Sequence, residues 1–182
     1  MTKIIDSIAA TGKTTLGKRP NVLDMDSKRY KYYWDEHFLL PAKARPKIAK
    51  HEQKHNPDWL QNYLNEIVRQ SKNYEIIVIG MSEEIYRNRE QYSKWFAENN
   101  FEYIVAIPEF DDLSEYLDEQ EKRGRERGSS DEGVAFVRKH TPTWIESMQK
   151  MYELGYRKVT IKRGEFLEHA LVREGIISGG GT

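Results

Sequence analysis

The sequence predicts an α/β protein with a parallel sheet that is covered by helices on both faces. Residues 75–79 ("EIIVI") and 103–107 ("YIVAI") are almost continuously apolar, and Gly80 and Pro108 follow them. Such runs are typical of strands that are buried on both faces of a sheet. Segments with apolar residues at helical spacing lie between them. Strands that alternate with helices form parallel sheets, and ligands of such folds bind beyond the carboxyl ends of the strands.

The first third of the chain predicts a strand, a short helix and a second strand. Residues 2–6 and 21–26 are the strand candidates, and Pro20 ends a helix that opens at residues 14–18. Residues 28–54 are predicted to be irregular or partly helical. A helix should start at Asn56-Pro57-Asp58, with Asn56 as its cap. Its buried face is expected to carry Leu60, Tyr63, Leu64, Ile67 and Val68.

The rest of the chain predicts three more helical stretches, a last strand and a final short helix. Ser82 can cap a helix to about residue 99, with Ile85, Tyr92 and Phe96 on one side. A helix over residues 113–120 should give way to a glycine-broken basic loop at 121–128. Ser129 and Glu132 predict a capping box for the next helix, which Pro142 should kink or split and Gly155 should close. A strand at 158–162 and a helix from Glu165 complete the pattern.

These elements predict one domain over residues 1–175. The expected lid is about 121–129, a variable insertion is about 28–55, and 176–182 is a flexible tail. The 182 residues suffice for one core, and Lys plus Arg balance Asp plus Glu at 29 each. Zero net charge gives no general attraction to nucleic acid or to an anionic membrane. No cysteine is present, and no apolar run approaches a membrane span, so we expect a cytoplasmic protein.

The octapeptide Ser7–Thr14 ("SIAATGKT") has the pattern of a phosphate-binding loop, except that Ser7 stands where the pattern has glycine. Backbone N–H groups at a helix N-terminus bind phosphate, and a glycine lets the backbone come close. Lys13 is expected to reach the β- and γ-phosphates, and the Thr14 hydroxyl to bind magnesium. The expected cofactors are therefore ATP and Mg²⁺. The loop residues expected to bind them are Ala10, Thr11, Gly12, Lys13, Thr14 and Thr15.

Two aspartates end the second predicted strand. Asp24 and Asp26 are two residues apart, so both side chains leave the strand on one face. Asp24 is expected to support the magnesium ion, and Asp26 to accept a proton or hydrogen bond from the acceptor. The alternative is that the pair only ends the strand, with Asp26 capping the next segment.

Arginines supply the charge that phosphoryl transfer has to neutralise. Those of the predicted lid stand in "EKRGRERG", where the alternative is a solvated charge run because glutamates alternate with the basic residues. Arg89 falls on the apolar side of its predicted helix. We expect Arg89 or Arg87 to bind the phosphate of an acceptor. The predicted catalytic residues are Lys13, Asp26, Arg123 and Arg127.

The order of these motifs resembles small nucleotide-kinase-like proteins of phages and Gram-positive bacteria. The resemblance rests on "GKTTL", "NVLDMDS", "IIVIGMSEE", "IVAIPEFDDLSEYLDEQEKRG" and "KVTIKRGEFLEHAL". It implies a three-layer P-loop fold of the kinase type and transfer of the γ-phosphate of ATP to a (deoxy)nucleoside monophosphate. It also implies that Asp26 and Ser27 touch the acceptor, with Arg87 or Arg89 on its phosphate. Ser7, "GMSEE" and "ERGSSDEG" depart from the pattern of that family.

Other functions stay open at this point. The acid pair on the second strand is also similar to that of shikimate-kinase-like enzymes, which phosphorylate a hydroxyl group of a small molecule. A nucleotide-binding regulator, for example a phage protein that acts on a host partner, is the alternative from another class. Aromatic and basic residues alternate at 28–34, which would suit a 5′-hydroxyl polynucleotide kinase. Zero net charge disfavours a nucleic-acid partner, so nucleotides are the expected substrates.

Overall fold

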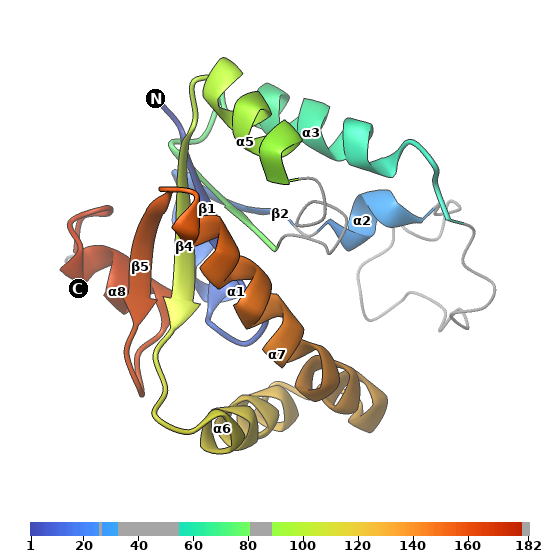
Figure 1. Cartoon of the computed structure of the whole chain (residues 1–182), viewed down its shortest axis with the longest axis vertical. Coiled ribbons are helices and arrows are strands. Elements are labelled where there is room, and N and C mark those ends of the chain that lie inside the picture. The colour runs from blue at the N-terminus through green and yellow to red at the C-terminus, as the bar shows by residue number, and fades with distance from the viewer. Residues whose placement is uncertain (26, 33–54, 81–88, 180–182) are drawn as a thin grey trace.

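Five parallel strands form one sheet, as the sequence predicts (Figure 1). The computed structural model describes residues 1–25, 27–32, 55–80 and 89–179. The strands are β1 (Lys3–Ser7), β2 (Val22–Met25), β3 (Ile76–Ile79), β4 (Glu102–Pro108) and β5 (Arg157–Ile161), in the order β2-β3-β1-β4-β5. Each neighbouring pair is parallel, so all five carboxyl ends meet at one edge. The first strand is central, and the loop that follows it lies in the middle of that edge.

Helices cover both faces of the sheet. One face packs against α3 (Trp59–Gln70), α5 (Arg89–Glu98) and α7 (Asp131–Glu153), and Ile4, Ile77 and Val105 belong to this core. The other face packs against α1 (Lys13–Leu16) and α8 (Leu167–Arg173), through Ile5 and Val78. The predicted fold class, a three-layer P-loop fold of the kinase type, is confirmed by this sheet and its flanking helices.

Helix α3 follows the predicted spacing but begins later than expected. Tyr63, Leu64 and Ile67 are buried, which confirms its predicted face. Asn56 is not the cap. Its side chain instead accepts the N–H of Asp58 at 3.1 Å and closes a turn before the helix, which begins at Trp59. This extra turn also buries Trp59, which the spacing did not include.

Helix α2 (Lys28–Lys31) confirms that the segment after β2 is partly helical. Residues 33–54 of the predicted insertion lie outside the described residues. Ser82 and Ile85 also lie outside the described residues. Tyr92 and Phe96 of the same predicted face are buried, and the ring centroids of Phe96 and Tyr103 lie 4.5 Å apart in a stacked arrangement.

The predicted basic loop at 121–128 is wrong, because α6 (Leu113–Glu126) continues through most of it. Two ion pairs at i,i+4 spacing, Glu119–Arg123 and Glu121–Arg125, stabilise this helical turn. The glycine that was taken as a helix breaker is buried in the helix instead. A Cβ atom on Gly124 would lie 3.3 Å from a methyl group of Val134 on α7, so the missing side chain allows the two helices to pack closely.

Helix α7 corrects one further expectation and narrows another. Its cap is Ser130, whose hydroxyl accepts the N–H of Gly133 at 3.2 Å, and not Ser129. Pro142 lies inside the continuous helix, so of its two predicted effects, a kink or a split, the split is excluded. Gly155 follows the helix with a φ of 88°, as predicted for a C-terminal glycine.

No helix in the described ranges combines the length and the apolar character needed to cross a membrane.

Gly124→Leu should separate α6 from α7, because a large side chain would overlap Val134. We expect the free energy of unfolding to fall by about 1–3 kcal/mol, measured by urea denaturation. Lys122→Leu on the exposed side of the same helix is the control, with a change within about 0.5 kcal/mol. Equal stabilities for the two variants would contradict the close approach of the helices.

Candidate functional site

The candidate loop connects the central strand to α1, in the order that a phosphate-binding loop requires. β1 ends at Ser7 and α1 begins at Lys13. Gly12 is the residue before the helix and has a left-handed conformation, with φ 96° and ψ 19°. Thr14 and Thr15 are exposed in the first turn of the helix, so the Thr14 hydroxyl is accessible to a metal ion.

Ser7 replaces the glycine of the pattern without strain. Among non-glycine residues of the described chain, positive φ angles occur at Ala10 and Asn100, and not at Ser7. The Ser7 side chain is buried, and its Oγ lies 2.8 Å from Oγ1 of Thr11. The Thr11 hydroxyl also lies 2.9 Å from the carbonyl of Ile8, and the Ser7 hydroxyl lies 3.5 Å from the carbonyl of Ala106. The serine hydroxyl therefore bridges the two ends of the loop.

Two residues of the loop adopt left-handed backbone conformations. Ala10 has a φ of 63°, which costs an L-residue with a Cβ atom roughly 1–2 kcal/mol. Gly12 has no such cost, and the space beside it is tight for a side chain. A Cβ atom there would lie 3.2 Å from the ring of Phe166. Alternating right- and left-handed residues turn successive N–H groups toward one point, which is the geometry of an anion-binding nest.

Lys13 lies across the loop. Its Nζ donates to the carbonyls of Ser7 at 2.8 Å and of Ile8 at 2.9 Å. A Cβ atom on Gly80 would be 3.4 Å from the same Nζ, so the ammonium group also lies against the end of β3. The positive charge is therefore held at the carboxyl edge of the sheet, next to the mouth of the loop.

The acidic candidates of β2 are only partly described. Leu23 and Met25, on either side of Asp24, pack into the core on the face covered by α3, α5 and α7. Because side chains alternate along a strand, Asp24 is on the other face of the sheet, which α1 covers. A Cβ atom on Gly17, at the end of α1, would lie 2.8 Å from the Cβ of Asp24. This places Asp24 beside the helix that carries Thr14. Asp26 lies outside the described residues.

Of the residues predicted to bind the acceptor, Ser27 lies within the described part of the chain. Its hydroxyl donates to the carbonyl of Gly80 at 3.4 Å, which joins the segments after β2 and β3 at the carboxyl edge. Arg89 begins the described part of α5, and Arg87 lies outside the described residues.

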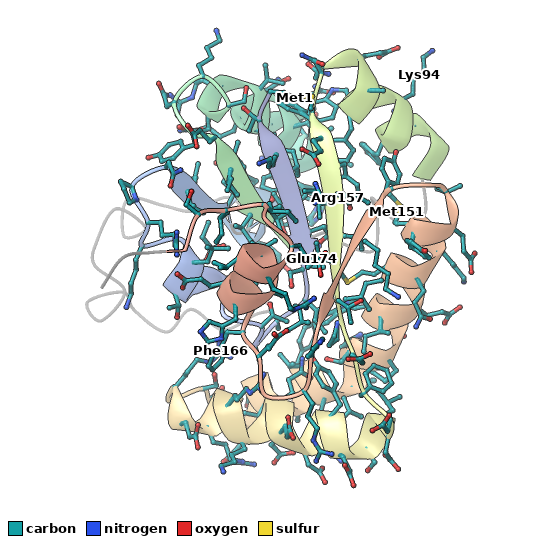
Figure 2. The ribbon with its side chains drawn as sticks, turned by 90° about the vertical axis from the view of Figure 1, so that its left-hand side faces the viewer. Met1, Lys94, Met151, Arg157, Phe166 and Glu174 are labelled. Atoms are coloured by element: carbon teal, nitrogen blue, oxygen red, sulfur yellow. The ribbon has the colours of Figure 1, made fainter. Side chains whose placement is uncertain are left out.

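The arginines of α6 differ in their surroundings. The guanidinium of Arg123 lies 5.1 Å above the ring of Phe166, which itself contacts Gly12, and it pairs with Glu119 at 3.7 Å. Phe166 lies between α8 and α6 (Figure 2). Arg127 is exposed at the end of α6, where its Nε donates to the carbonyl of Arg123. Of the two predicted catalytic arginines, Arg123 therefore lies next to the loop, whereas Arg127 belongs to the end of the helix.

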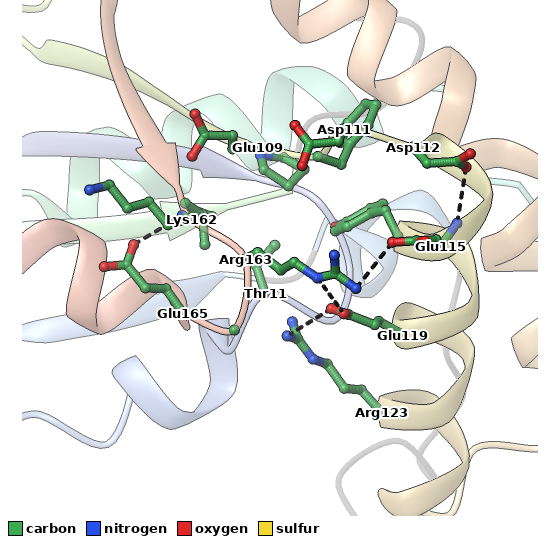
Figure 3. Close-up of a pocket in the computed structure, with 15 residues that line it drawn as sticks. Thr11, Glu109, Asp111, Asp112, Glu115, Glu119, Arg123, Lys162, Arg163 and Glu165 are labelled. Atoms are coloured by element: carbon green, nitrogen blue, oxygen red, sulfur yellow. Dashed lines mark hydrogen bonds and ion pairs between the residues drawn. The ribbon is translucent and has the colours of Figure 1, made fainter.

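A pocket lies beside the loop, between α6 and the turn that follows β5 (Figure 3). Thr11 forms one wall, and Arg163 extends into it between Glu115 and Glu119. Tyr116 lines the same pocket, and burial raises the pKa of its phenol above the ordinary value.

Sequence reasoning missed a buried polar chain that reaches the loop. The Gln120 side chain on α6 donates from Nε2 to the carbonyl of Ala9 at 3.0 Å. Thr141 on α7 donates to Oε1 of Gln120 at 2.8 Å. Both side chains are buried. Thr141 stands between Val137 and Ile145 at helical spacing, and this polar residue in an apolar stripe could have indicated the contact.

A buried carboxylate on β1 was also missed. Asp6 is 1% exposed and accepts the hydroxyl of Tyr103 at 2.7 Å. An aspartate in an otherwise apolar strand was the available indication, because buried charges require partners.

Comparisons with known proteins find similar solved structures but no match by sequence. No protein-family model matches the chain, and no curated protein matches it by sequence. Among solved structures, the tunicamycin resistance protein of Deinococcus radiodurans has a TM-score of 0.50 at 13% identity, over 96% of this chain and 94% of that one. A protein of the PezAT toxin–antitoxin system of Streptococcus pneumoniae has 0.47 at 12%, over 100% and 80%. A gluconokinase from Sinorhizobium meliloti has 0.43 at 13%, over 95% and 88%.

The first of these likenesses, together with the sheet order and the loop, defines the chain as a P-loop α/β protein. At 13% identity the likeness extends to the fold alone.

Ser7→Gly would restore the glycine of the pattern, but we expect it to destabilise the protein. The variant loses a buried hydrogen bond and adds backbone freedom to a strand, together about 1–2 kcal/mol. Ser7→Ala separates the two effects, because it removes only the hydroxyl. Thermal and urea unfolding of both variants would test this, and a more stable glycine variant would show that Ser7 is strained.

Proposed function

We propose that this chain is an ATP-dependent phosphotransferase. The observation that carries the proposal is the loop itself, with a left-handed Gly12 at the start of α1 and the Lys13 ammonium across its mouth. Gly12 has the left-handed conformation that an anion-binding nest uses, and the ring of Phe166 packs against the side where a Cβ atom would stand. Residues of these types at a strand-to-helix turn suit a triphosphate with magnesium.

Each residue of the loop has a role in this proposal. ATP supplies the transferable phosphoryl group, and Mg²⁺ neutralises part of its charge. Lys13 would exchange its two carbonyl partners for phosphate oxygens, which is a short movement because it already lies at the loop. The exposed Thr14 hydroxyl would bind the magnesium ion. Asp24, on the same side of the sheet, would support the bound ion. Arg123 is close enough to the loop to neutralise charge that develops during transfer.

The acceptor that we propose is a (deoxy)nucleoside monophosphate. An oxygen of its phosphate would form a bond to the γ-phosphorus while the bond from that phosphorus to the bridging oxygen of ADP breaks. Asp26, Ser27, Arg87 and Arg89 follow β2 and β3, which puts them at the carboxyl edge by sequence. The bond from Ser27 to Gly80 supports a shared acceptor site between these two segments.

Lys13→Ala should abolish phosphoryl transfer. The measurement is ADP release from Mg-ATP, screened over all ribo- and deoxynucleoside monophosphates, small hydroxyl compounds and a 5′-hydroxyl oligonucleotide. One monophosphate should stimulate release, and the variant should lower that rate about 100-fold or more. Lys18→Ala, an exposed lysine just beyond α1, is the control and should retain the rate of the unchanged protein.

The same screen separates the alternatives. Stimulation by a hydroxyl compound or by the oligonucleotide would replace the acceptor but keep the transferase. No stimulation by any acceptor, with ATP still raising the melting temperature, would overturn the transferase and leave a nucleotide-binding protein.

Asp24→Asn should raise the magnesium requirement. Loss of the carboxylate weakens a metal-supporting position by about 10- to 100-fold, so half-maximal activity should need correspondingly more Mg²⁺. A magnesium titration of ADP release at saturating ATP measures this. Asp58→Asn, an exposed aspartate without a side-chain cap bond, is the control. Unchanged magnesium curves would remove Asp24 from the metal site.

A further inference from the structure

The buried chain from Thr141 through Gln120 to Ala9 connects three separate parts of the molecule. Thr141 belongs to α7, Gln120 to α6, and Ala9 to the candidate phosphate loop. The two side chains are 0% and 3% exposed, so water competes little for these bonds. Burying the Gln120 amide and the Thr141 hydroxyl costs free energy unless both are hydrogen-bonded.

The orientation of the Gln120 amide can be assigned from chemistry alone. The Ala9 carbonyl only accepts, so the amide nitrogen of Gln120 must face it and the amide oxygen must face Thr141. Thr141 lies 2.8 Å from that oxygen and also 2.8 Å from the carbonyl of Val137. It has one hydrogen, which these two acceptors share, so the Thr141 hydroxyl supplies a donor to the Gln120 amide oxygen while it also bonds to its own helix.

Fixing the Ala9 carbonyl also fixes the next N–H group. In a trans peptide the C=O of one residue and the N–H of the next point in opposite directions in one plane. The described chain contains no cis peptide, so the N–H of Ala10 points away from α6. Ala10 has the strained φ of 63°. The hydrogen bond from Gln120 holds the Ala9–Ala10 peptide, which directly precedes this torsion.

We propose that Gln120 and Thr141 are positioning residues for phosphate binding, because they orient the Ala9–Ala10 peptide so that its N–H faces the phosphate. This inference rests on the proposed function for the identity of the ligand, a triphosphate. Neither residue touches the ligand itself. Both act through the backbone of the loop.

The same contact couples the loop to the hairpin of α6 and α7. Gly124 packs on Val134, and Arg138 of α7 pairs with Asp118 and Glu121 of α6, so the two helices are held together around Gln120. A displacement of the hairpin would move the Gln120 amide relative to Ala9. By thermodynamic reciprocity, a ligand that needs the oriented peptide also stabilises the docked hairpin.

The test is the binding of two probes, Mg-ATP and tripolyphosphate, to the full chain by calorimetry. Thr141→Val keeps the shape of the side chain and removes the donor. It should weaken both probes about five- to tenfold, the loss of roughly one buried hydrogen bond. Thr141→Ser should bind within about twofold of the unchanged protein. Thr143→Val, an exposed threonine on the same helix, is the matched control.

Two further readouts distinguish positioning from general stability. KM for ATP should rise in Thr141→Val with kcat nearly unchanged, because the loss is in binding. Tripolyphosphate should slow amide hydrogen exchange in α6 of the unchanged protein and have less effect in Thr141→Val. Gln120→Leu should repeat the loss of affinity, and if it fails to fold, the threonine pair alone still decides.

Normal affinity of a folded Thr141→Val for both probes would overturn the proposal, as would equal losses in Thr141→Val and Thr141→Ser. A chain that binds tripolyphosphate but transfers no phosphate would refute the proposed function while the positioning role is still measured. A chain that binds neither probe would refute both.

Discussion

The arrangement of the site depends on how the carbonyl groups of the loop are satisfied. Lys13 donates to the carbonyls of Ser7 and Ile8, Gln120 to that of Ala9, and the N–H of Leu167 to that of Thr11. The donors to Ala9 and Thr11 come from α6 and α8, so two helices hold the loop from outside, whereas Lys13 bonds to it from the mouth. Because the peptides are trans, the carbonyls of Ala9 and Thr11 turn the following N–H groups away from α6 and α8. The cradle is therefore a product of the whole carboxyl edge of the sheet, and the loop sequence alone does not create it.

The elements that the sequence predicted well are those in which one local rule acts without competition. The apolar runs before Gly80 and Pro108 could only be buried strands, and they became β3 and β4. The mistakes occurred where a tertiary contact overrode a local preference. Gly124 disfavours a helix by about 1 kcal/mol, but the approach of Val134 and two favourable ion pairs keep α6 continuous. Asn56 was predicted as a cap by residue type, yet its side chain closes a turn through the N–H of Asp58, and α3 begins beyond it at Trp59.

The candidate site shows the same division. A motif with fixed spacing places Gly12, Lys13 and Thr14 on one turn, so sequence was enough to predict their association. Phe166 contacts Gly12, and Gln120 bonds to Ala9 across a separation of 111 residues. No local sequence pattern encodes contacts between residues so far apart in the chain. Ser7 illustrates the limit of a motif in another way. The glycine it replaces is not needed for a positive φ here, and the serine hydroxyl adds a bond that the pattern does not describe.

The helical form of the predicted lid changes how the site could close. Arg125 pairs with Glu121 and Asp131, and α6 packs on α7, so the arginines are carried by a helix and not by a separate loop. Closure would have to move the hairpin as one body. Helix α7 packs on the sheet through Ile145 and Met148 but on α6 through Val134, and Pro142 lies between these two halves. Proline lacks the N–H that would bond four residues back, so bending costs least at that point. Thr141 is adjacent to it, and any such bend would reach the phosphate loop first through Gln120.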